Sequence, residues 1–460
     1  MSNTNPKRIL LVTVVTAFMT TFMGSALNLS IPSMEADFQV GAALIGWVIT
    51  AYTLTVAAFS VPFGKLADVI GRRKILHCGL VLFWCFTLCC FFAGNIWLLL
   101  VFRILQGIGA SMIFATNNPI LISVYPPTER GRVLGMSTAA VYVGLSVGPV
   151  VGGFLNHHFD WHSIFMLTMI LATASLYLEM KHIPAELDAA QAASKGPKTD
   201  LAGNLLYIVC IAITLYGLSS LSTLRYGWAI LLTGLLLGAA FVKAEAKAEN
   251  PVIRISMFTE DKAFAFSNIA ALLNYGATFA ISYLMSIYLQ VIMGYTSQTA
   301  GLILIAQPLM QALFSPMMGK LSDRIPPYKL ATAGMSFCVV GLILFAMVGL
   351  ETSIIFIIAA LMLSGFGFAL FSSPNTNAVM SCVQPKDYSV ANSILSTMRS
   401  VGQSSSMAVV TIVVGMTMGS QALTAAEPDT LVHTMHIIFS IFIALCLVGV
   451  VLSMQRRKIQ

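Results

Sequence analysis

Long apolar runs, separated by short polar segments, recur from one end of the chain to the other. A helix that crosses a bilayer needs roughly 20 mostly apolar residues, and the runs have about that length. The pattern therefore predicts fourteen spanning helices, at residues 9–31, 44–64, 75–93, 97–119, 132–154, 163–182, 201–221, 227–246, 263–289, 298–319, 328–349, 352–376, 389–417 and 434–455.

Two polar stretches, residues 183–200 and 243–262, are longer than the other breaks and bracket a single pair of apolar runs. A two-lobed membrane protein with related halves is expected to have this layout, namely six helices, a two-helix insert and six more helices. We therefore predict an N-terminal six-helix lobe, linkers with a two-helix insert, and a C-terminal six-helix lobe, at residues 1–183, 184–262 and 263–460.

Composition supports an all-α polytopic membrane protein. Hydrophobic residues make up 57% of the chain and charged residues only 9%, whereas soluble domains carry about 25% charged residues. The mean hydropathy is +0.86. The lipid bilayer is therefore the expected surrounding of most of the chain.

The placement of the positive charges predicts the orientation. If the chain crosses fourteen times, the loop cations from Lys7 to Lys458 fall on one face, and Arg225 alone falls on the other. Lys and Arg accumulate in cytoplasmic loops, so we expect a multi-pass protein of the cell inner (cytoplasmic) membrane with both termini cytoplasmic. The net charge of +7 has no accompanying groove or stacking pattern, which argues against nucleic acid as a partner.

Candidate chemistry for catalysis is scarce. The eight cysteines form no CxxC or Cys/His metal spacing, and no GxxxxGK[ST] string for nucleotide phosphates occurs. A membrane-embedded enzyme or a receptor is a possible class, but no paired carboxylates or Ser/His/Asp grouping supports it. We expect neither an enzyme nor a protein with a metal or cofactor.

The segment between the second and third predicted helices, residues 64–74, reads GKLADVIGRRK. Its two glycines permit a tight reversal, and Asp68 lies at a helix end, where a carboxylate can pair with nearby cations or cap a helix N-terminus. A short basic loop without further function is the alternative. The candidate conformational residues here are Gly64, Asp68, Gly71, Arg72 and Arg73.

This string resembles the hallmark loop of the major facilitator superfamily, G-x-L-x-D-x-x-G-R-(K/R)-(K/R). A shorter echo, residues 319–324, follows the tenth predicted helix, which is the matching place in the second half once the insert is skipped. The echo favours duplicated halves.

The fourth predicted helix contains Arg103 and Gln106 in the string RILQG. An arginine within a span costs roughly 2.5–3.5 kcal/mol on insertion scales, so it should face a cavity or a partner. The string resembles the R-x-x-Q-G signature of the same superfamily, which implies a role of these two residues in proton coupling. Structural packing of the helix is the alternative.

Glycines recur every four residues on the fifth predicted helix, which places them on one face where a neighbouring backbone can approach closely. A proline bends the helix there. The segment resembles the antiporter signature G-x8-G-x3-G-P-x2-G-G, which in the superfamily marks exporters. Its candidate conformational residues are Gly144, Gly148, Pro149, Gly152 and Gly153.

Together these segments resemble the fourteen-helix drug:proton antiporter family of the superfamily. The resemblance implies the major facilitator fold, a monomer, and proton-coupled efflux of drugs or other small organic molecules by alternating access, with an ion gradient in place of a cofactor. Uptake or facilitated transport of a polar or anionic metabolite or vitamin is the alternative function.

The first predicted helix departs from the family pattern. Many members carry an acidic residue where this chain has Met23, although Asn28 and Pro32 match the pattern. No carboxylate lies near the middle of any predicted span, and Glu179 is expected to snorkel to the membrane surface. A lipophilic cation is normally balanced by a buried carboxylate that also carries the proton. Cationic drugs are therefore disfavoured as substrates.

A polar stripe marks the thirteenth predicted helix. Asn392, Ser396, Arg399 and Gln403 are spaced by four, three and four residues and so share one face. We predict that this face lines a polar cavity and that Arg399 helps to hold an anionic, zwitterionic or polar neutral substrate; a structural arginine bonded to carbonyls is the alternative. Further candidates for the cavity are Asn28, Gln307 and Gln311.

Overall fold

The structure is a computed structural model that describes residues 5–40, 42–184, 200–221, 224, 226–418 and 427–456. Within these residues the regular elements are helices, and none is a strand. Fourteen helical segments are long and apolar enough to cross a bilayer. The prediction of an all-α protein with fourteen spanning helices is therefore confirmed.

The first half of the chain contributes six spanning helices and four short elements. The spanning helices are α1 (Pro6–Ala26), α4 (Trp47–Ile70), α5 (Arg72–Phe91), α6 (Ile96–Val124), α7 (Arg130–His158) and α8 (His162–His182). The short elements are η1 (Leu27–Ser30), α2 (Ile31–Phe38), α3 (Ala42–Ile45) and η2 (Pro127–Glu129).

The second half follows the same plan after a helical hairpin. The hairpin consists of α10 (Leu201–Ser220) and α11 (Gly227–Glu245), and α12 (Ser256–Thr259) follows it. The remaining elements are α13 (Lys262–Thr278), α14 (Ile281–Val291), α15 (Ser297–Leu304), α16 (Ala306–Leu321), α17 (Pro327–Ala346), α18 (Ile354–Ser381), η3 (Pro385–Asp387), α19 (Tyr388–Met418) and α20 (Pro428–Gln455). The segments α13–α14 and α15–α16 each form one span.

Side-chain caps set the start of several spans. Asn95 Oδ1 accepts a hydrogen bond of 2.9 Å from Leu98 N at the start of α6. Asp261 Oδ1 accepts one of 2.9 Å from Phe264 N at the start of α13. Asn and Asp are favoured at such positions because the first N–H groups of a helix have no partner within it.

Some helices continue past the apolar run that predicts them. The run at 44–64 belongs to a helix that ends at Ile70, and the run at 97–119 to one that ends at Val124. The added turns project into the polar region beyond the apolar core, so hydropathy alone does not detect them.

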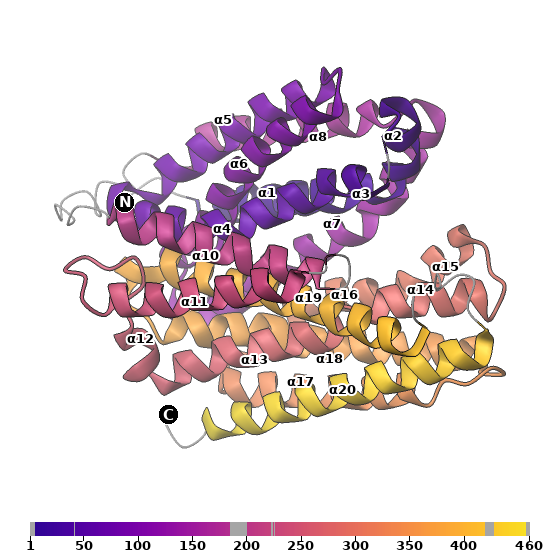
Figure 1. Cartoon of the computed structure of the whole chain (residues 1–460). Helices are drawn as coiled ribbons and strands as arrows, with labels where there is room; N and C mark the ends of the chain where they lie inside the picture. Colours follow the sequence, from indigo (N-terminus) through magenta and orange to yellow (C-terminus); the bar gives the residue numbers. More distant parts are fainter. Residues whose placement is uncertain are drawn as a thin grey trace.

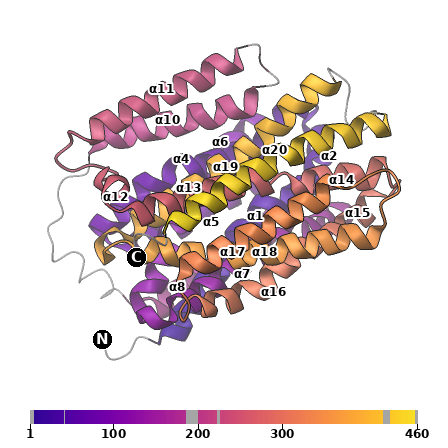
Figure 2. The same ribbon diagram turned by 90° about the horizontal axis from the view of Figure 1, so that it is seen from below.

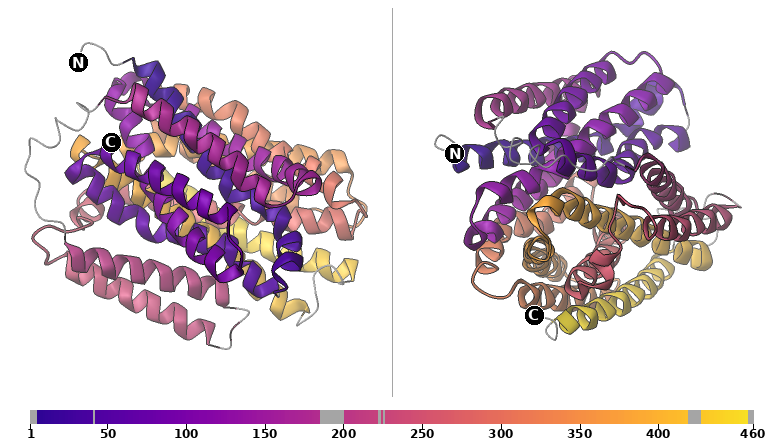
Figure 3. Two further views of the ribbon diagram at one scale, coloured as in Figure 1. Left: turned by 90° about the horizontal axis from the view of Figure 1, so that it is seen from above. Right: turned by 90° about the vertical axis from the view of Figure 1, so that its left-hand side faces the viewer.

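The spanning helices form two groups (Figure 1). We call α1 and α4–α8 the N lobe and α13–α20 the C lobe. Viewed along the bundle, the two groups lie on opposite sides of a central interface (Figure 3, right). The chain enters α1 and leaves α20 at the same end of the bundle (Figure 1), which we call the terminal end.

The α10–α11 hairpin packs beside the interface instead of joining either lobe (Figure 2). Tyr207 on α10 shares a 2.7 Å hydrogen bond with Thr397 on α19 of the C lobe. Tyr216, also on α10, packs against Trp47 of the N lobe with ring centroids 5.5 Å apart. The hairpin therefore touches both lobes.

Hydrogen bonds between the lobes involve the half of the bundle that includes the terminal end. They join α4, α5, α6 and α7 to α18, α19, η3 and Asp323, which follows α16. At the opposite end, α2 and α15 stand well apart (Figure 1). The lobes are thus closed against each other at the terminal end.

Candidate functional site

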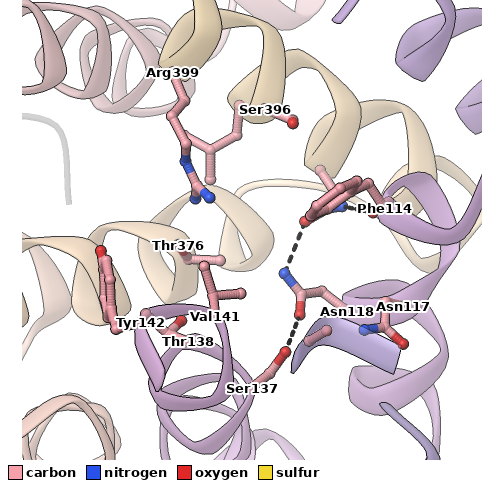
Figure 4. A pocket seen from close by; sticks show the side chains of 13 residues that line it. Phe114, Asn117, Asn118, Ser137, Thr138, Val141, Tyr142, Thr376, Ser396 and Arg399 are labelled. Carbon is pink, nitrogen blue, oxygen red and sulfur yellow. Dashed lines mark hydrogen bonds between the residues drawn. The ribbon is translucent and has the colours of Figure 1, made fainter. Parts of the chain in front are cut away.

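A polar cavity lies between the two lobes, roughly midway along the helices. It encloses about 50 Å³ and receives side chains from α1, α6 and α7 of the N lobe and α18 and α19 of the C lobe. Amides and hydroxyls make up most of the polar lining, namely Asn117, Asn118, Ser137, Thr138, Tyr142, Thr376, Asn392 and Ser396 (Figure 4). Apolar side chains complete it, namely Ala17, Phe114, Val141 and Leu395.

Arg399 is the charged residue of this lining. Its guanidinium points toward the middle of the cavity (Figure 4), and its Cζ atom stands 5.0 Å from the centre of the Tyr275 ring. The Nε atom is buried and has no hydrogen-bond partner within the described part of the chain. Asn392 and Ser396 of the predicted stripe also line the cavity.

Tyr142 connects the lobes beside Arg399, next to Tyr275 of the C lobe. The Tyr142 hydroxyl on α7 donates a 3.1 Å hydrogen bond to Ser372 Oγ on α18, and the Tyr275 hydroxyl lies 3.3 Å from the same atom. Both rings meet Phe368 edge-on, at centroid distances of 6.0 and 5.0 Å. An aromatic wall therefore stands next to the guanidinium.

Amides join the lobes on the side of the cavity nearer the terminal end. Asn118 Nδ2 donates a 3.1 Å hydrogen bond to Asn392 Oδ1 across the interface. Asn392 Nδ2 donates in turn to the Phe114 carbonyl at 2.8 Å, and Ser137 Oγ donates to Asn118 Oδ1 at 3.0 Å. These bonds close the cavity from the terminal end while the lobes stay together.

Asp68 holds the start of α19 at the terminal end. One carboxylate oxygen accepts hydrogen bonds of 2.9 Å from Ser389 N and 3.0 Å from Val390 N. The other forms a 2.7 Å ion pair with Arg72, whose guanidinium also donates to the Pro385 carbonyl. A carboxylate at the first N–H groups of a helix complements the positive end of its dipole. The predicted capping role of Asp68 agrees with this geometry.

Asp323 repeats the arrangement with the lobes exchanged. Its two carboxylate oxygens accept hydrogen bonds of 2.6 Å from Gly131 N and 2.9 Å from Arg132 N, at the start of α7. Burial raises the pKa of Asp323 above its ordinary range, and these two backbone N–H groups partly offset that rise. The echo at residues 319–324 thus marks a second contact of the same kind.

Glycines let the backbones meet at both contacts. A Cβ atom at Gly64 would stand 2.7 Å from the Ser389 carbonyl oxygen. A Cβ atom at Gly319 would overlap the Gly131 carbonyl oxygen of the other lobe. Gly71 separates α4 from α5 with a φ of 120°, a conformation that glycine adopts without strain.

Glu179 does not snorkel to the surface, contrary to the prediction. Its side chain on α8 is fully buried and lies 3.2 Å from Arg73 Nε and 2.7 Å from His77 Nδ1, both on α5. These two partners on the neighbouring helix hold the carboxylate inside the N lobe. The hallmark loop therefore supplies one arginine to the lobe interface, Arg72, and another to the lobe interior, Arg73.

Arg103 and Gln106 lie inside the N lobe, away from the cavity lining. Arg103 is fully buried, donates to the Val48 carbonyl at 2.8 Å and to Gln106 Oε1 at 2.6 Å, and stands 4.4 Å from the Tyr52 ring. Gln106 Nε2 donates to Thr87 Oγ1 at 2.7 Å. The pair ties α4, α5 and α6 together. Its predicted part in coupling stays a prediction.

The glycine face of α7 packs closely against α1. A Cβ atom at Gly144, Gly148 or Gly152 would overlap atoms of α1. The Ser25 hydroxyl donates a 3.2 Å hydrogen bond to the Gly144 carbonyl at this contact. Pro149 and Gly153 continue the same segment of α7.

Four predicted cavity residues are not part of the lining. Asn28 is exposed in η1, near the end of α1 that lies away from the terminal end. Gln307 accepts a 3.3 Å hydrogen bond from Ser282 within the C lobe, and Gln311 is buried on the same helix, α16. Gln403 lies one turn of α19 beyond Arg399.

The residues of α6 and α7 that line the cavity were not predicted from the sequence. Asn117 and Asn118 precede Pro119 in the middle of an apolar run, and Ser137 begins a small polar patch on α7. Polar residues within a span usually face a cavity or another helix. Adjacent amides inside a span were therefore a usable signal.

Comparisons with known proteins agree on the family. The sequence profile of the Major Facilitator Superfamily matches residues 13–243 and 268–458. The riboflavin transporter RibZ of Clostridioides difficile (strain 630) is 30% identical over 393 residues, which are 85% of this chain and 85% of that protein. The multidrug resistance protein Stp of Mycobacterium tuberculosis (strain CDC 1551 / Oshkosh) is 28% identical over 389 residues, or 83% and 71% of the two chains.

A solved structure agrees on the fold. The human organic anion transporter MFSD10 (TETRAN) superposes with a TM-score of 0.70 at 13% identity, covering 98% of this chain and 100% of that chain. At this level of identity the similarity concerns the fold alone.

Proposed function

This chain belongs to the Major Facilitator Superfamily of membrane transporters, and from that premise we propose that it carries a polar small organic molecule without positive charge across the bilayer by alternating access. One observation supports this most directly. The cavity is built from both lobes and lined by amides, hydroxyls and one guanidinium, with no carboxylate among its lining residues. Such a surface suits neutral or anionic polar groups and disfavours cations.

The lobe contacts explain how access would alternate. The enclosed volume of about 50 Å³ is far below the roughly 300–1,000 Å³ of a drug-sized binding site. A substrate therefore needs the lobes to move apart. Opening toward the terminal end requires the separation of Asp68 from α19 and of Asp323 from α7, since each contact joins opposite lobes.

We also propose the cell inner membrane as the location, with the terminal end in the cytoplasm and the monomer as the working unit. The positive-inside rule supports this orientation, because Arg72, Arg130 and Lys320 all lie at the terminal end. Arg225, the one loop cation expected on the other face, is outside the described residues. The structure would then represent the conformation closed to the cytoplasm.

Riboflavin is the first substrate to test, since a relative of 30% identity is named for its transport and the molecule bears no positive charge at neutral pH. The purified protein would be reconstituted into vesicles loaded with unlabelled riboflavin, and entry of labelled riboflavin by counterflow would be measured. The proposal predicts saturable counterflow. Entry no faster than into protein-free vesicles would overturn riboflavin as a substrate.

Proton-coupled drug export is the second candidate function, and the glycine face of α7 favours it. Gly144, Gly148 and Gly152 match the antiporter signature and pack on α1. The test is ethidium accumulation in an efflux-deficient bacterium expressing the protein, with and without a protonophore. If expression lowers ethidium accumulation and the protonophore restores it, the result would support this candidate. Unchanged accumulation, with the protein shown to be in the membrane, would exclude cationic ethidium as a substrate.

A further inference from the structure

Arg399 places a positive charge in the cavity that no residue of the lining balances. The lining contains no Asp or Glu, and the buried Nε atom has no hydrogen-bond partner among the residues that the structure describes. The Tyr275 ring lies beside the guanidinium. The hydroxyls of Tyr142 and Thr376 belong to the same lining (Figure 4). A ring face attracts a cation but does not neutralise it. An uncompensated cation at this depth calls for an anion.

The carboxylates of the spanning helices are engaged elsewhere. Asp68 caps α19 and pairs with Arg72. Glu179 pairs with Arg73 and His77 inside the N lobe. Glu245 on α11 accepts from the backbone N–H of Ile253 at 3.0 Å, and Asp429 lies in the first turn of α20, at the end away from the terminal end. None of them lines the cavity, so none stands beside a bound substrate to exchange a proton with it.

We propose that the cavity binds a small organic anion at Arg399 and that the membrane potential, with no exchanged proton, drives its export. This inference rests on the proposed transport function and names its substrate class. The guanidinium supplies directional N–H donors for a carboxylate, sulfonate or phosphate group. Among the adjoining rings of Tyr142, Tyr275 and Phe368, that of Tyr142 lines the cavity and suits contact with an aromatic ring on the same molecule.

The charge of the site decides which step of the cycle the potential acts on. With a monovalent anion bound, the site is neutral overall; when empty, it carries the single charge of Arg399. The membrane potential drops across the closed side of the site, so the site is at the potential of the compartment to which it is open. A negative cytoplasm therefore favours the return of the empty site from the outside to the inside. Each cycle moves one negative charge outward, and 100 mV sustains roughly a 50-fold gradient of the anion.

Two flavins that differ in charge test the inference in reconstituted vesicles. Carboxymethylflavin has one carboxylate, and riboflavin has the same ring and no net charge. Valinomycin with potassium gradients sets the potential, and a pH gradient is applied separately at zero potential. Net flux of carboxymethylflavin should leave the negative compartment and approach a roughly 50-fold ratio at 100 mV. A pH gradient alone should drive no flux.

A measurement of exchange separates the movement of the loaded site from the return of the empty site. Exchange of labelled for unlabelled carboxymethylflavin uses only the loaded, neutral site, so its rate should not change with the potential. Net flux passes through the empty site and should respond to it. An exchange rate that changes with the potential would contradict the charge assignment.

Variants on one face of α19 connect the result to Arg399. Arg399→Gln should lower the ratio of carboxymethylflavin flux to riboflavin flux about tenfold or more, because a charged hydrogen bond is lost. It should also make the rate of exchange depend on the potential, because the loaded site would then carry the negative charge of the anion and the empty site would carry none. Arg399→Lys keeps the charge and should keep the rate of exchange independent of the potential. Gln403→Ala, one turn further along and outside the lining, is the matched control and should behave as the wild type.

The possible outcomes separate this inference from the proposed function. If riboflavin moves and carboxymethylflavin does not, or if a pH gradient drives flux, the inference fails and the transport function stands. If neither flavin moves, flavin transport fails, and thermal stability decides the inference. Benzoate, benzenesulfonate and phenyl phosphate should then raise the Tm of the wild type more than that of Arg399→Gln, with benzamide as the neutral control. No such difference would overturn the anion site.

Discussion

A methyl group at Gly64 tests whether the contact of α4 with α19 belongs to only one state of the transport cycle. A Cβ atom there would stand 2.5 Å from Ser393 Oγ and 2.7 Å from the Ser389 carbonyl oxygen, whereas ordinary contacts begin at 3.4 Å. The helices would have to separate by roughly 0.7 Å, and overpacking of this kind costs about 1–3 kcal/mol. In the proposed alternating-access cycle only the state closed at the terminal end bears that cost, because opening there would separate these helices.

The expected consequence of Gly64→Ala is a shift toward the state that is open at the terminal end. A cost of about 1–3 kcal/mol corresponds to a rise of roughly 5- to 150-fold in the ratio of open to closed molecules. Ser396→Cys, in a background without the eight native cysteines, would report this shift. Its reaction rate with a membrane-impermeant maleimide would be measured in inverted vesicles, where the terminal end faces the reagent.

Gly415→Ala is the matched control for this experiment. It makes the same substitution within α19, at a position where a Cβ atom would meet nothing within 4 Å. The change in helix propensity is the same at both sites. A reaction rate that stays at the control level in Gly64→Ala, or an equal rise in Gly415→Ala, would refute the reasoning.

Three further predictions concern the terminal-end contacts and the contact of α7 with α1. Asp68→Ala or Asp323→Ala leaves two helix N–H groups without an acceptor, so each should destabilise the closed state by about 0.5–2 kcal/mol and speed maleimide reaction at Ser396→Cys. Burial raises the pKa of Asp323 in the closed state, so the closed state binds the proton more tightly than the open state does. The maleimide reaction should therefore slow as the pH at the terminal end falls into the range between the ordinary carboxyl pKa and the raised one. Asp323→Asn should remove this pH dependence. Gly148→Ala would overlap Ser25 Oγ and should lower the free energy of unfolding by about 1–3 kcal/mol, measured as a lower Tm in detergent.

The spanning helices were predictable because bilayer physics imposes a long apolar run on each of them. The terminal-end contacts were partly predictable as well. Asp68 lies beyond an apolar run and beside cations, which indicates a capping role, and the echo that contains Asp323 favoured duplicated halves. The helix N-termini that these residues cap could not be predicted, since each cap joins segments that are far apart in sequence, such as Asp68 and Ser389.

Periodicity established which residues share a helix face but not where that face points. The stripe on α19 indeed brings Asn392, Ser396 and Arg399 to the cavity. The same reasoning grouped Gln307 with Gln311, which are buried on α16 but do not line it. The rotation of each helix about its axis is set by packing against its neighbours. This rotation cannot be predicted from a single sequence.

The position of Glu179 shows the same limit. Its place near the end of a span favours snorkelling when only α8 is considered. The partners that hold it inside, Arg73 and His77, lie on α5. A carboxylate near a membrane surface therefore needs a search for cations on neighbouring helices before snorkelling is assumed.

The central claim is that the substrate passes through the cavity between the lobes. The most direct test is riboflavin counterflow by the Ser396→Cys protein, in the cysteine-free background, before and after reaction with a bulky maleimide. Ser396 lines the cavity, so the label should abolish counterflow, and riboflavin present during labelling should protect the cysteine. Full counterflow after complete labelling would contradict the claim.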